Sequence, residues 1–144
     1  MTKTEQAMQS IAILKNMGLQ VLEESRNTLK IAMPKEGNGN HLGGVYAGAI
    51  FTLAEFPFGV MCVNRFSTDE IVPVVGEVTI RFMAPASGTL TVALTISDQE
   101  WDQIERETKL HGKCKVVKDI EITDAQGKIN AVAKATYFTL AVKK

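Results

Sequence analysis

The segment spanning residues 38–59, NGNHLGGVYAGAIFTLAEFPFG, combines residue types and spacing that are suited to chemistry. A glycine-rich loop leads directly into an apolar run that carries one carboxylate, Glu55. Glu55 is the only acid between Asn40 and Cys62. Burial among apolar neighbours raises the pKa of a carboxyl group, and a carboxylate tuned in this way suits general acid–base catalysis. Glu55 is therefore the first candidate for a catalytic residue.

The apolar run predicts a helix that begins near Ala47 and is buried on nearly every side. The first N–H groups of a helix lack intrahelical partners and carry a partial positive charge. They suit an anion or a polarised carbonyl group. Gly43 and Gly44 permit the loop geometry and a close approach to this helix end, and Gly48 removes a side chain from the first turn.

Gly48, Thr52 and Glu55 share one stripe of the predicted helix, because seven residues make about two turns. The stripe is small at one end and acidic at the other, so a thin ligand fits along it. The rise from Gly48 to Glu55 is roughly 10 Å, at about 1.5 Å per residue. A base acts within about 3 Å of its proton, and oxyanion donors lie about 3 Å from the oxygen. The spacing thus predicts a site shared by two copies of the chain, or one completed by a neighbouring segment.

A purely structural role for the same residues stays open from spacing alone. Glu55 would then pair with a Lys or Arg, and the glycines would ease packing. His41 is a second candidate base, although an exposed loop residue is the simpler interpretation. Pro57 predicts that the helix bends or stops near Glu55 and that the carbonyl of Leu53 becomes free to hold a water.

The rest of the chain supplies the elements that must position these residues. Apolar side chains alternate in the later part of the sequence, as in half-buried strands, and recur at helical spacing at the start. One domain covering residues 1–144 is expected, of the α+β class, with an antiparallel sheet wrapped around a long central helix. The predicted elements are a helix at 2–18, strands at 19–24 and 28–34, the central helix, strands at 72–85 and 88–97, a helix at 97–110, and a strand hairpin at 113–122 and 129–142.

Composition excludes several classes of function. Basic and acidic residues number 16 each, which argues against nucleic acid as a partner. The N-terminus lacks the apolar core of a signal peptide, and no apolar run reaches the ~20 residues of a membrane span. Cys62 and Cys114 are isolated, as in reduced thiols of a cytoplasmic protein, and no four-ligand metal set can be assembled. We expect a cytoplasmic protein without metal or membrane contact.

The stretch from Asn40 to Gly48, continued by AIFTLAE, resembles the signature of acyl-CoA thioesterase-like hotdog proteins, in particular the phenylacetate-degradation type. The tail GKCKVVKDIEITDAQGKINAVAKATYFTL is similar to the closing strands of that family. The preceding ISDQEWDQIERETKLHGK is similar to a helix inserted in one subgroup with few characterised members. This resemblance covers most of the chain and implies a hotdog fold.

The resemblance also implies roles for individual residues. Glu55 stands where the family has its general base or nucleophile, and Asn40 stands where an asparagine places the substrate or water. Ala47 and Gly48 match two glycines whose N–H groups polarise the thioester carbonyl. Two departures are Tyr46 in place of a histidine and Ala47 in place of a glycine. The residues expected to contact substrate are Gly43, Gly44, Tyr46, Thr52 and Arg81, the last toward the phosphates of coenzyme A.

The leading expectation is a homodimeric or homotetrameric acyl-CoA thioesterase that uses no cofactor, because coenzyme A is part of its substrate. One alternative is an acyl-CoA-binding hotdog protein without turnover. Another is a hotdog enoyl-CoA hydratase or dehydratase, against which the absence of a histidine at Tyr46 argues. The identity of the acyl group is not predicted, because it depends on the packing of the pocket.

Overall fold

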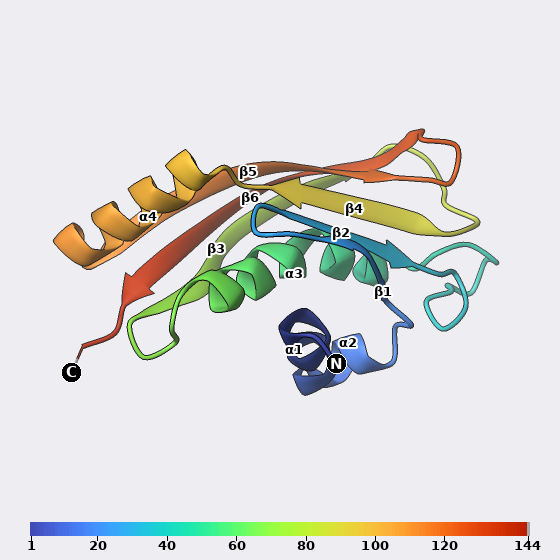
Figure 1. Cartoon of the computed structure of the whole chain (residues 1–144). Coiled ribbons are helices and arrows are strands. Elements are labelled where there is room, and N and C mark those ends of the chain that lie inside the picture. Colours follow the sequence, from blue (N-terminus) through green and yellow to red (C-terminus); the bar gives the residue numbers. More distant parts are fainter. Residues whose placement is uncertain (144) are drawn as a thin grey trace.

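The computed structural model describes residues 1–143, which form four helices and six strands (Figure 1). In chain order the elements are α1 (Lys3–Ser10), α2 (Ala12–Lys15), β1 (Gln20–Glu24), β2 (Thr28–Met33), α3 (Ala47–Arg65), β3 (Ile71–Phe82), β4 (Leu90–Thr95), α4 (Asp98–His111), β5 (Lys113–Thr123) and β6 (Ile129–Ala141). The predicted order of helix, two strands, central helix and four strands with a helical insertion is confirmed.

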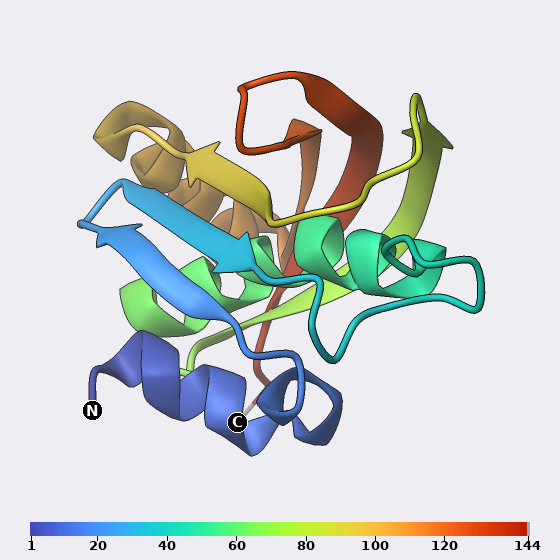
Figure 2. The same ribbon diagram turned by 90° about the vertical axis from the view of Figure 1, so that its right-hand side faces the viewer.

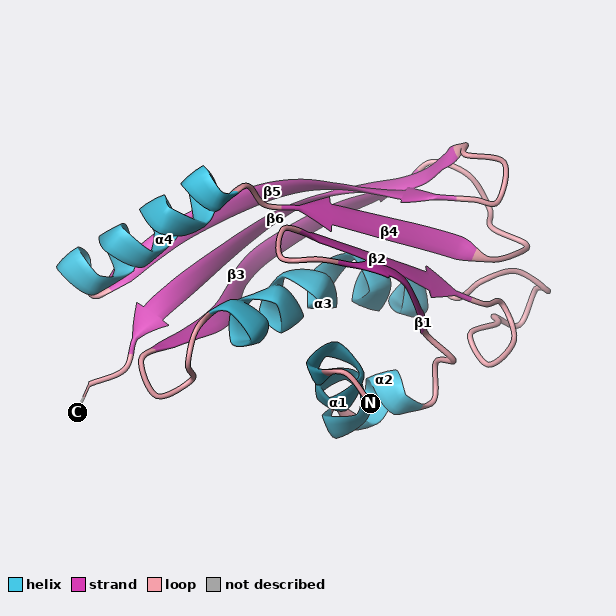
Figure 3. Ribbon diagram, viewed as in Figure 1, coloured by secondary structure: helices cyan, strands magenta, loops and turns pink. Residues whose placement is uncertain are grey.

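The six strands form one antiparallel sheet in the order β1-β2-β4-β5-β6-β3. The sheet curves over α3, and α1 and α2 lie on the far side of that helix (Figures 1 and 2). Figure 3 shows that the strands gather in one layer and that α4 lies next to β5, apart from α1 and α2. This is the α+β architecture of a sheet wrapped around a central helix.

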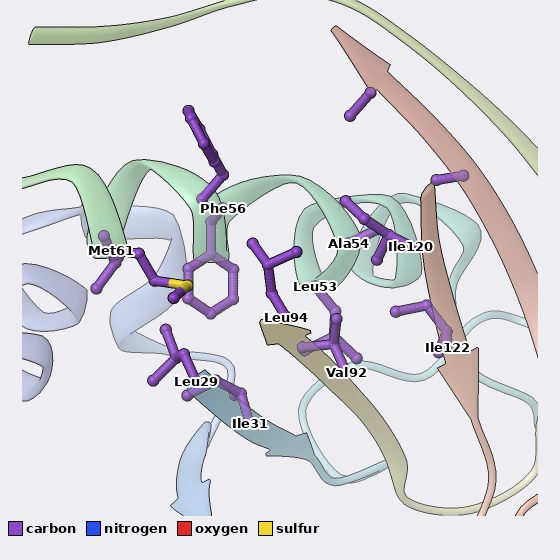
Figure 4. Packing of buried hydrophobic residues seen from close by; sticks show 14 of the residues in the cluster. Leu29, Ile31, Leu53, Ala54, Phe56, Met61, Val92, Leu94, Ile120 and Ile122 are labelled. Carbon is purple, nitrogen blue, oxygen red and sulfur yellow. The ribbon is translucent and has the colours of Figure 1, made fainter. Parts of the chain in front are cut away.

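Alternation along the strands builds the core between the sheet and α3. On β4 every second side chain is buried, and on β5 the buried side chains also lie at alternate positions, because successive strand residues face opposite sides. Figure 4 shows these aliphatic side chains meeting Leu53, Ala54 and Phe56 of α3. The labelled sheet residues of this cluster are Leu29, Ile31, Val92, Leu94, Ile120 and Ile122.

The central helix α3 runs through Pro57 and continues to Arg65, so of the two predicted effects of Pro57, a bend or a stop, the stop near Glu55 is wrong. Phe56 and Phe58 are buried beside the proline, and their packing offsets the lost backbone hydrogen bond. The length and apolar composition of α3 would also suit a membrane span, but half of this stretch is buried within the molecule. The sheet on one side of α3 accounts for its apolar character.

The predicted N-terminal helix is divided in two. Ile11 adopts an extended conformation, with φ −97° and ψ 107°, and separates α1 from α2. Thr2 and Glu5 cap α1 reciprocally at its start. Gly18, which follows α2, has a left-handed conformation, with φ 64°. The break turns α2 toward the start of α3, where it borders a cavity described below.

Candidate functional site

The loop before α3 is organised by the side chain of Asn40. Its Oδ1 accepts hydrogen bonds of 2.9 Å from the N–H groups of Leu42 and Gly44. The turn places Gly43 at φ 82°, in the left-handed region that favours glycine. The amide nitrogen of Asn40 makes only a 3.4 Å contact with the carbonyl of Val45. Asn40 therefore shapes this loop, and its NH₂ group is the part left to donate to a ligand.

Two backbone hydrogen bonds fix the chain as it enters the helix. The N–H of Val45 donates to the carbonyl of Ala86 at 2.8 Å, and the N–H of Tyr46 donates to the carbonyl of Asn38 at 2.7 Å. Gly44 lies so close to the Ala86 carbonyl that a Cβ would approach its oxygen to 2.9 Å. That contact favours glycine at position 44.

The first turn of α3 leaves two N–H groups open. Tyr46 is the N-cap residue and provides no side-chain cap. The N–H groups of Ala49 and Ile50 donate to its carbonyl at 3.0 and 3.1 Å. Within residues 1–143, the N–H groups of Ala47 and Gly48 have no hydrogen-bond acceptor. The open donors thus belong to the two residues that the family resemblance singles out.

The aromatic ring of Tyr46 lies over Gly48. A Cβ at position 48 would come within 2.4 Å of the ring. Tyr46 is 58% exposed, and with Gly48 and Thr52 it borders a cavity of about 380 Å³ between α2 and α3. Thr52 donates its hydroxyl to the carbonyl of Gly48 at 2.9 Å. The predicted empty stripe above Gly48 is therefore partly filled by Tyr46, and the open space lies beside the ring.

Glu55 is half-buried and faces a second cavity, of about 300 Å³. Its carboxylate has no hydrogen bond and no ion pair among the described residues, so the pairing with a Lys or Arg that a structural role required is not observed. Burial raises the pKa of the Glu55 carboxyl group above its ordinary value. The other residues of this cavity are Ala7, Ser10, Ile11, Phe56, Gly59, Val60, Val63 and Pro73.

Gly48 and Glu55 lie on one side of α3 but border different cavities. The N-terminal segment covers both cavities, with α2 over the first and α1 over the second. A single chain consequently does not bring the open N–H groups and the carboxylate to one carbonyl. This agrees with the separation that the helix spacing predicted.

Arg81 lies away from these residues. Its neighbour Ile80 packs against the core, so Arg81 points to the face of the sheet opposite α3. There it borders a shallow cavity with Asp119, Glu121 and Lys134. Strand alternation thus turns Arg81 outward, away from the start of α3, and its expected contact with the phosphates of coenzyme A stays a prediction. His41 is exposed, and residues 1–143 contain no group of three or more His, Cys, Asp or Glu arranged to hold a metal.

Tyr137 is a residue near the site that the sequence did not single out. Its hydroxyl donates a 2.8 Å hydrogen bond to the backbone carbonyl of Glu55. The two residues are 82 positions apart in the chain, so no local pattern connects them. The available signal was a tyrosine at an inward position of a buried strand, where its hydroxyl needs a partner.

Comparison with known proteins identifies a matching family and several similar structures. Residues 6–140 match the family described as a domain of unknown function, DUF4442. A Pseudomonas aeruginosa protein of unknown function, PA5026, described as a probable thioesterase, is 32% identical over 96% of this chain and 94% of its own, with a TM-score of 0.90. Thioesterase HI1161 of Haemophilus influenzae (13% identity, 96% and 89% coverage, TM-score 0.73) and PaaI from the E. coli phenylacetic acid degradation operon (22%, 98% and 94%, 0.68) share the fold. No curated protein sequence matches the chain.

The fold and these relatives define a hotdog protein of the thioesterase-like class. The chain belongs to the DUF4442 family. The sequence resemblance to hotdog thioesterases is thereby confirmed at the level of fold and family.

Proposed function

We propose that this protein hydrolyses acyl-CoA thioesters at a site shared between two subunits. The observation that carries the proposal is the unpaired, half-buried carboxylate of Glu55, on the same helix as the open N–H groups of Ala47 and Gly48. An oxyanion site and a base are the two groups that thioester hydrolysis requires. Similarity to a protein described as a probable thioesterase supports the same reaction class.

In this mechanism the thioester oxygen accepts hydrogen bonds from the N–H groups of Ala47 and Gly48. Glu55 of the partner subunit removes a proton from a water, and the resulting hydroxide attacks the carbonyl carbon. The tetrahedral intermediate then collapses, the C–S bond breaks, and the proton passes from Glu55 to the departing sulfur. The NH₂ group of Asn40 is the donor available to orient the water. The products are a carboxylic acid and free coenzyme A.

A second copy is needed because the two groups border separate cavities within one subunit. The surface beside the site suits such a contact. Strand β3 is an edge of the sheet, and its residues Val74 and Val75 are 41% and 48% exposed. Phe51 of α3 is also exposed. An exposed apolar edge strand is a template for pairing with another chain, so a homodimer joined along β3 is the assembly that we propose, alone or within a tetramer.

The cavity beside Tyr46 is the space proposed for the acyl group. It begins at Gly48, and Ile13 and Met17 of the N-terminal segment provide apolar walls. At about 380 Å³ it lies near the small end of ligand pockets, which span about 300–1,000 Å³. A compact acyl group, aliphatic or aromatic, fits this space better than a long chain.

One observation favours the alternative of acyl-CoA binding without turnover, namely the Tyr46 ring that lies across Gly48. A panel of acyl-CoA thioesters with detection of the released thiol distinguishes the two functions. We expect release of coenzyme A that depends on enzyme concentration. Binding by calorimetry without thiol release would overturn hydrolysis and support the binding protein, and hydration of an enoyl-CoA would instead indicate a hydratase.

A further inference from the structure

The hydroxyl of Tyr137 holds the helix backbone at the residue that carries the candidate base. Tyr137 lies on β6, is 2% exposed, and donates its 2.8 Å hydrogen bond to the Glu55 carbonyl. Its ring stacks on Phe58 of α3, with ring centroids 4.2 Å apart. The side chain thus connects the sheet to α3 by both a polar and an aromatic contact.

This part of α3 needs such a connection because Pro57 lies inside the helix. Proline has no N–H group, so the carbonyl of Leu53 loses its usual helical donor. A proline also distorts the turn before it, which is the turn that contains Glu55. The hydrogen bond from Tyr137 restrains the backbone at this point from outside the helix.

We infer that Tyr137 is a positioning residue for Glu55: its hydroxyl fixes the helix turn at Glu55 so that the carboxylate faces the cavity under α1. This inference rests on the proposed function of Glu55 as the base. It explains why a tyrosine stands at an inward strand position, where phenylalanine would fill the same volume without needing a partner.

The electrostatic surroundings keep this hydroxyl a donor. Burial raises the pKa of Tyr137, and the nearby Glu55 carboxylate raises it further. Burial also raises the pKa of the Cys62 thiol, which therefore stays neutral. No charged side chain other than Glu55 borders the Glu55 cavity in residues 1–143. A titration of this cavity therefore reports on the Glu55 carboxyl group.

Tyr137→Phe tests the inference, because it retains the ring and removes only the hydroxyl. Thr139→Val is the matched control: Thr139 is two residues further along β6, is fully buried, and shares a 2.6 Å hydrogen bond with Thr108. Both variants lose one buried hydroxyl. We expect kcat of Tyr137→Phe to fall by about 10- to 100-fold, since a misplacement of about 1 Å costs up to about 10²-fold, with KM nearly unchanged. Thr139→Val should keep kcat.

A second readout does not depend on turnover. The Glu55 carboxyl group is titrated by ¹³C NMR in wild type and in both variants. In Tyr137→Phe we expect its midpoint to move down toward the ordinary value of about 4.3, because the released side chain reaches water more easily. An unchanged midpoint, or a kcat equal to wild type, would overturn the positioning role. If wild type releases no coenzyme A while the NMR shift is present, hydrolysis fails and the structural coupling between Tyr137 and Glu55 stands.

Discussion

The surroundings of Glu55 destabilise its charged form, and this supports a role for the residue in the proposed reaction. A half-buried carboxylate without an ion pair is unfavourable in its charged form, and burial raises its pKa. Groups of this kind gather at functional sites, where a shifted pKa serves the reaction. The sequence predicted that Glu55 is a lone acid among apolar neighbours. It could not predict that no Lys or Arg reaches the carboxylate, because that depends on contacts between distant segments.

Glu55→Gln should stabilise the protein at neutral pH. The folded-state pKa of Glu55 is raised above the unfolded value of about 4.3, so this residue favours folding fully below that value and loses the contribution as pH rises through the folded-state pKa. Glutamine has no such dependence. The difference in unfolding free energy between variant and wild type should therefore grow as the pH rises above about 4.3 and become constant above the folded-state pKa. Thermal unfolding at several pH values measures it, and a lower Tm of the variant at pH 7 would indicate a structural partner for Glu55.

At the scale of elements, period-two alternation predicted the strands well, and the central helix began at the expected residue. The break at Ile11 was missed because the residues on both sides keep helical spacing, and nothing in their types marks an extended residue. The sequence left open whether α3 bends or stops at Pro57, and it continues because buried packing outweighs a local signal. The outward direction of Arg81 was available from alternation, since Ile80 occupies the inward position beside it.

Two glycines of α3 should respond differently to alanine. A Cβ at Gly59 meets nothing within 4 Å, whereas a Cβ at Gly48 would collide with the Tyr46 ring. Gly59→Ala should stabilise the protein by about 0.5–1 kcal/mol, because glycine is a poor helix former. Gly48→Ala should gain less or lose stability. Adding Tyr46→Ala should remove the difference, and urea unfolding of the three variants measures it. Equal gains at both positions in the presence of Tyr46 would show that the ring does not rest on Gly48.

The larger substitution at this end of the helix should affect ligand binding. Gly48→Val places a branched side chain beside the open N–H groups and against the Tyr46 ring, in the space proposed for the acyl group. We expect a folded protein that no longer binds acyl-CoA, as measured by calorimetry with circular dichroism as the folding control. Unchanged affinity in a folded Gly48→Val protein would mean that the ligand lies elsewhere.

At the scale of the whole molecule, the proposed reaction requires groups from two chains. The open N–H groups and Glu55 border different cavities, and the β3 edge exposes apolar side chains. Sequence spacing predicted the separation, because it follows from the helical rise alone. The spacing could not predict which surface would contact a second copy, because the proposed contact depends on the position of β3 at the edge of the sheet.

Sedimentation should show a species of at least twice the 15.7 kDa mass of one chain. Val75→Lys, which places a charge on the exposed edge, should shift the protein toward the monomer and remove activity. Val117→Lys is the control, because Val117 is also about half exposed but lies on β5, in the middle of the sheet. A monomeric wild-type protein that is fully active would contradict the shared site.

Mixing two inactive variants tests the sharing directly. In a mixed dimer of Glu55→Gln and Gly48→Val, one of the two sites draws both of its groups from unaltered positions. Equal mixing after subunit exchange should thus restore about a quarter of wild-type activity, because half of the dimers are mixed. Absence of any recovery, with exchange verified by mass spectrometry, would place both groups of each site in one subunit.

The most direct test of the central claim is the kcat of Glu55→Gln in acyl-CoA hydrolysis, measured together with Tm on the same preparation. Glutamine retains the shape of the side chain and removes the base. Because a general base contributes about 10²- to 10⁴-fold, kcat should fall by that factor with little change in KM, in a protein at least as stable as wild type at pH 7. A folded Glu55→Gln protein that hydrolyses the same acyl-CoA at the wild-type rate would remove Glu55 from the mechanism.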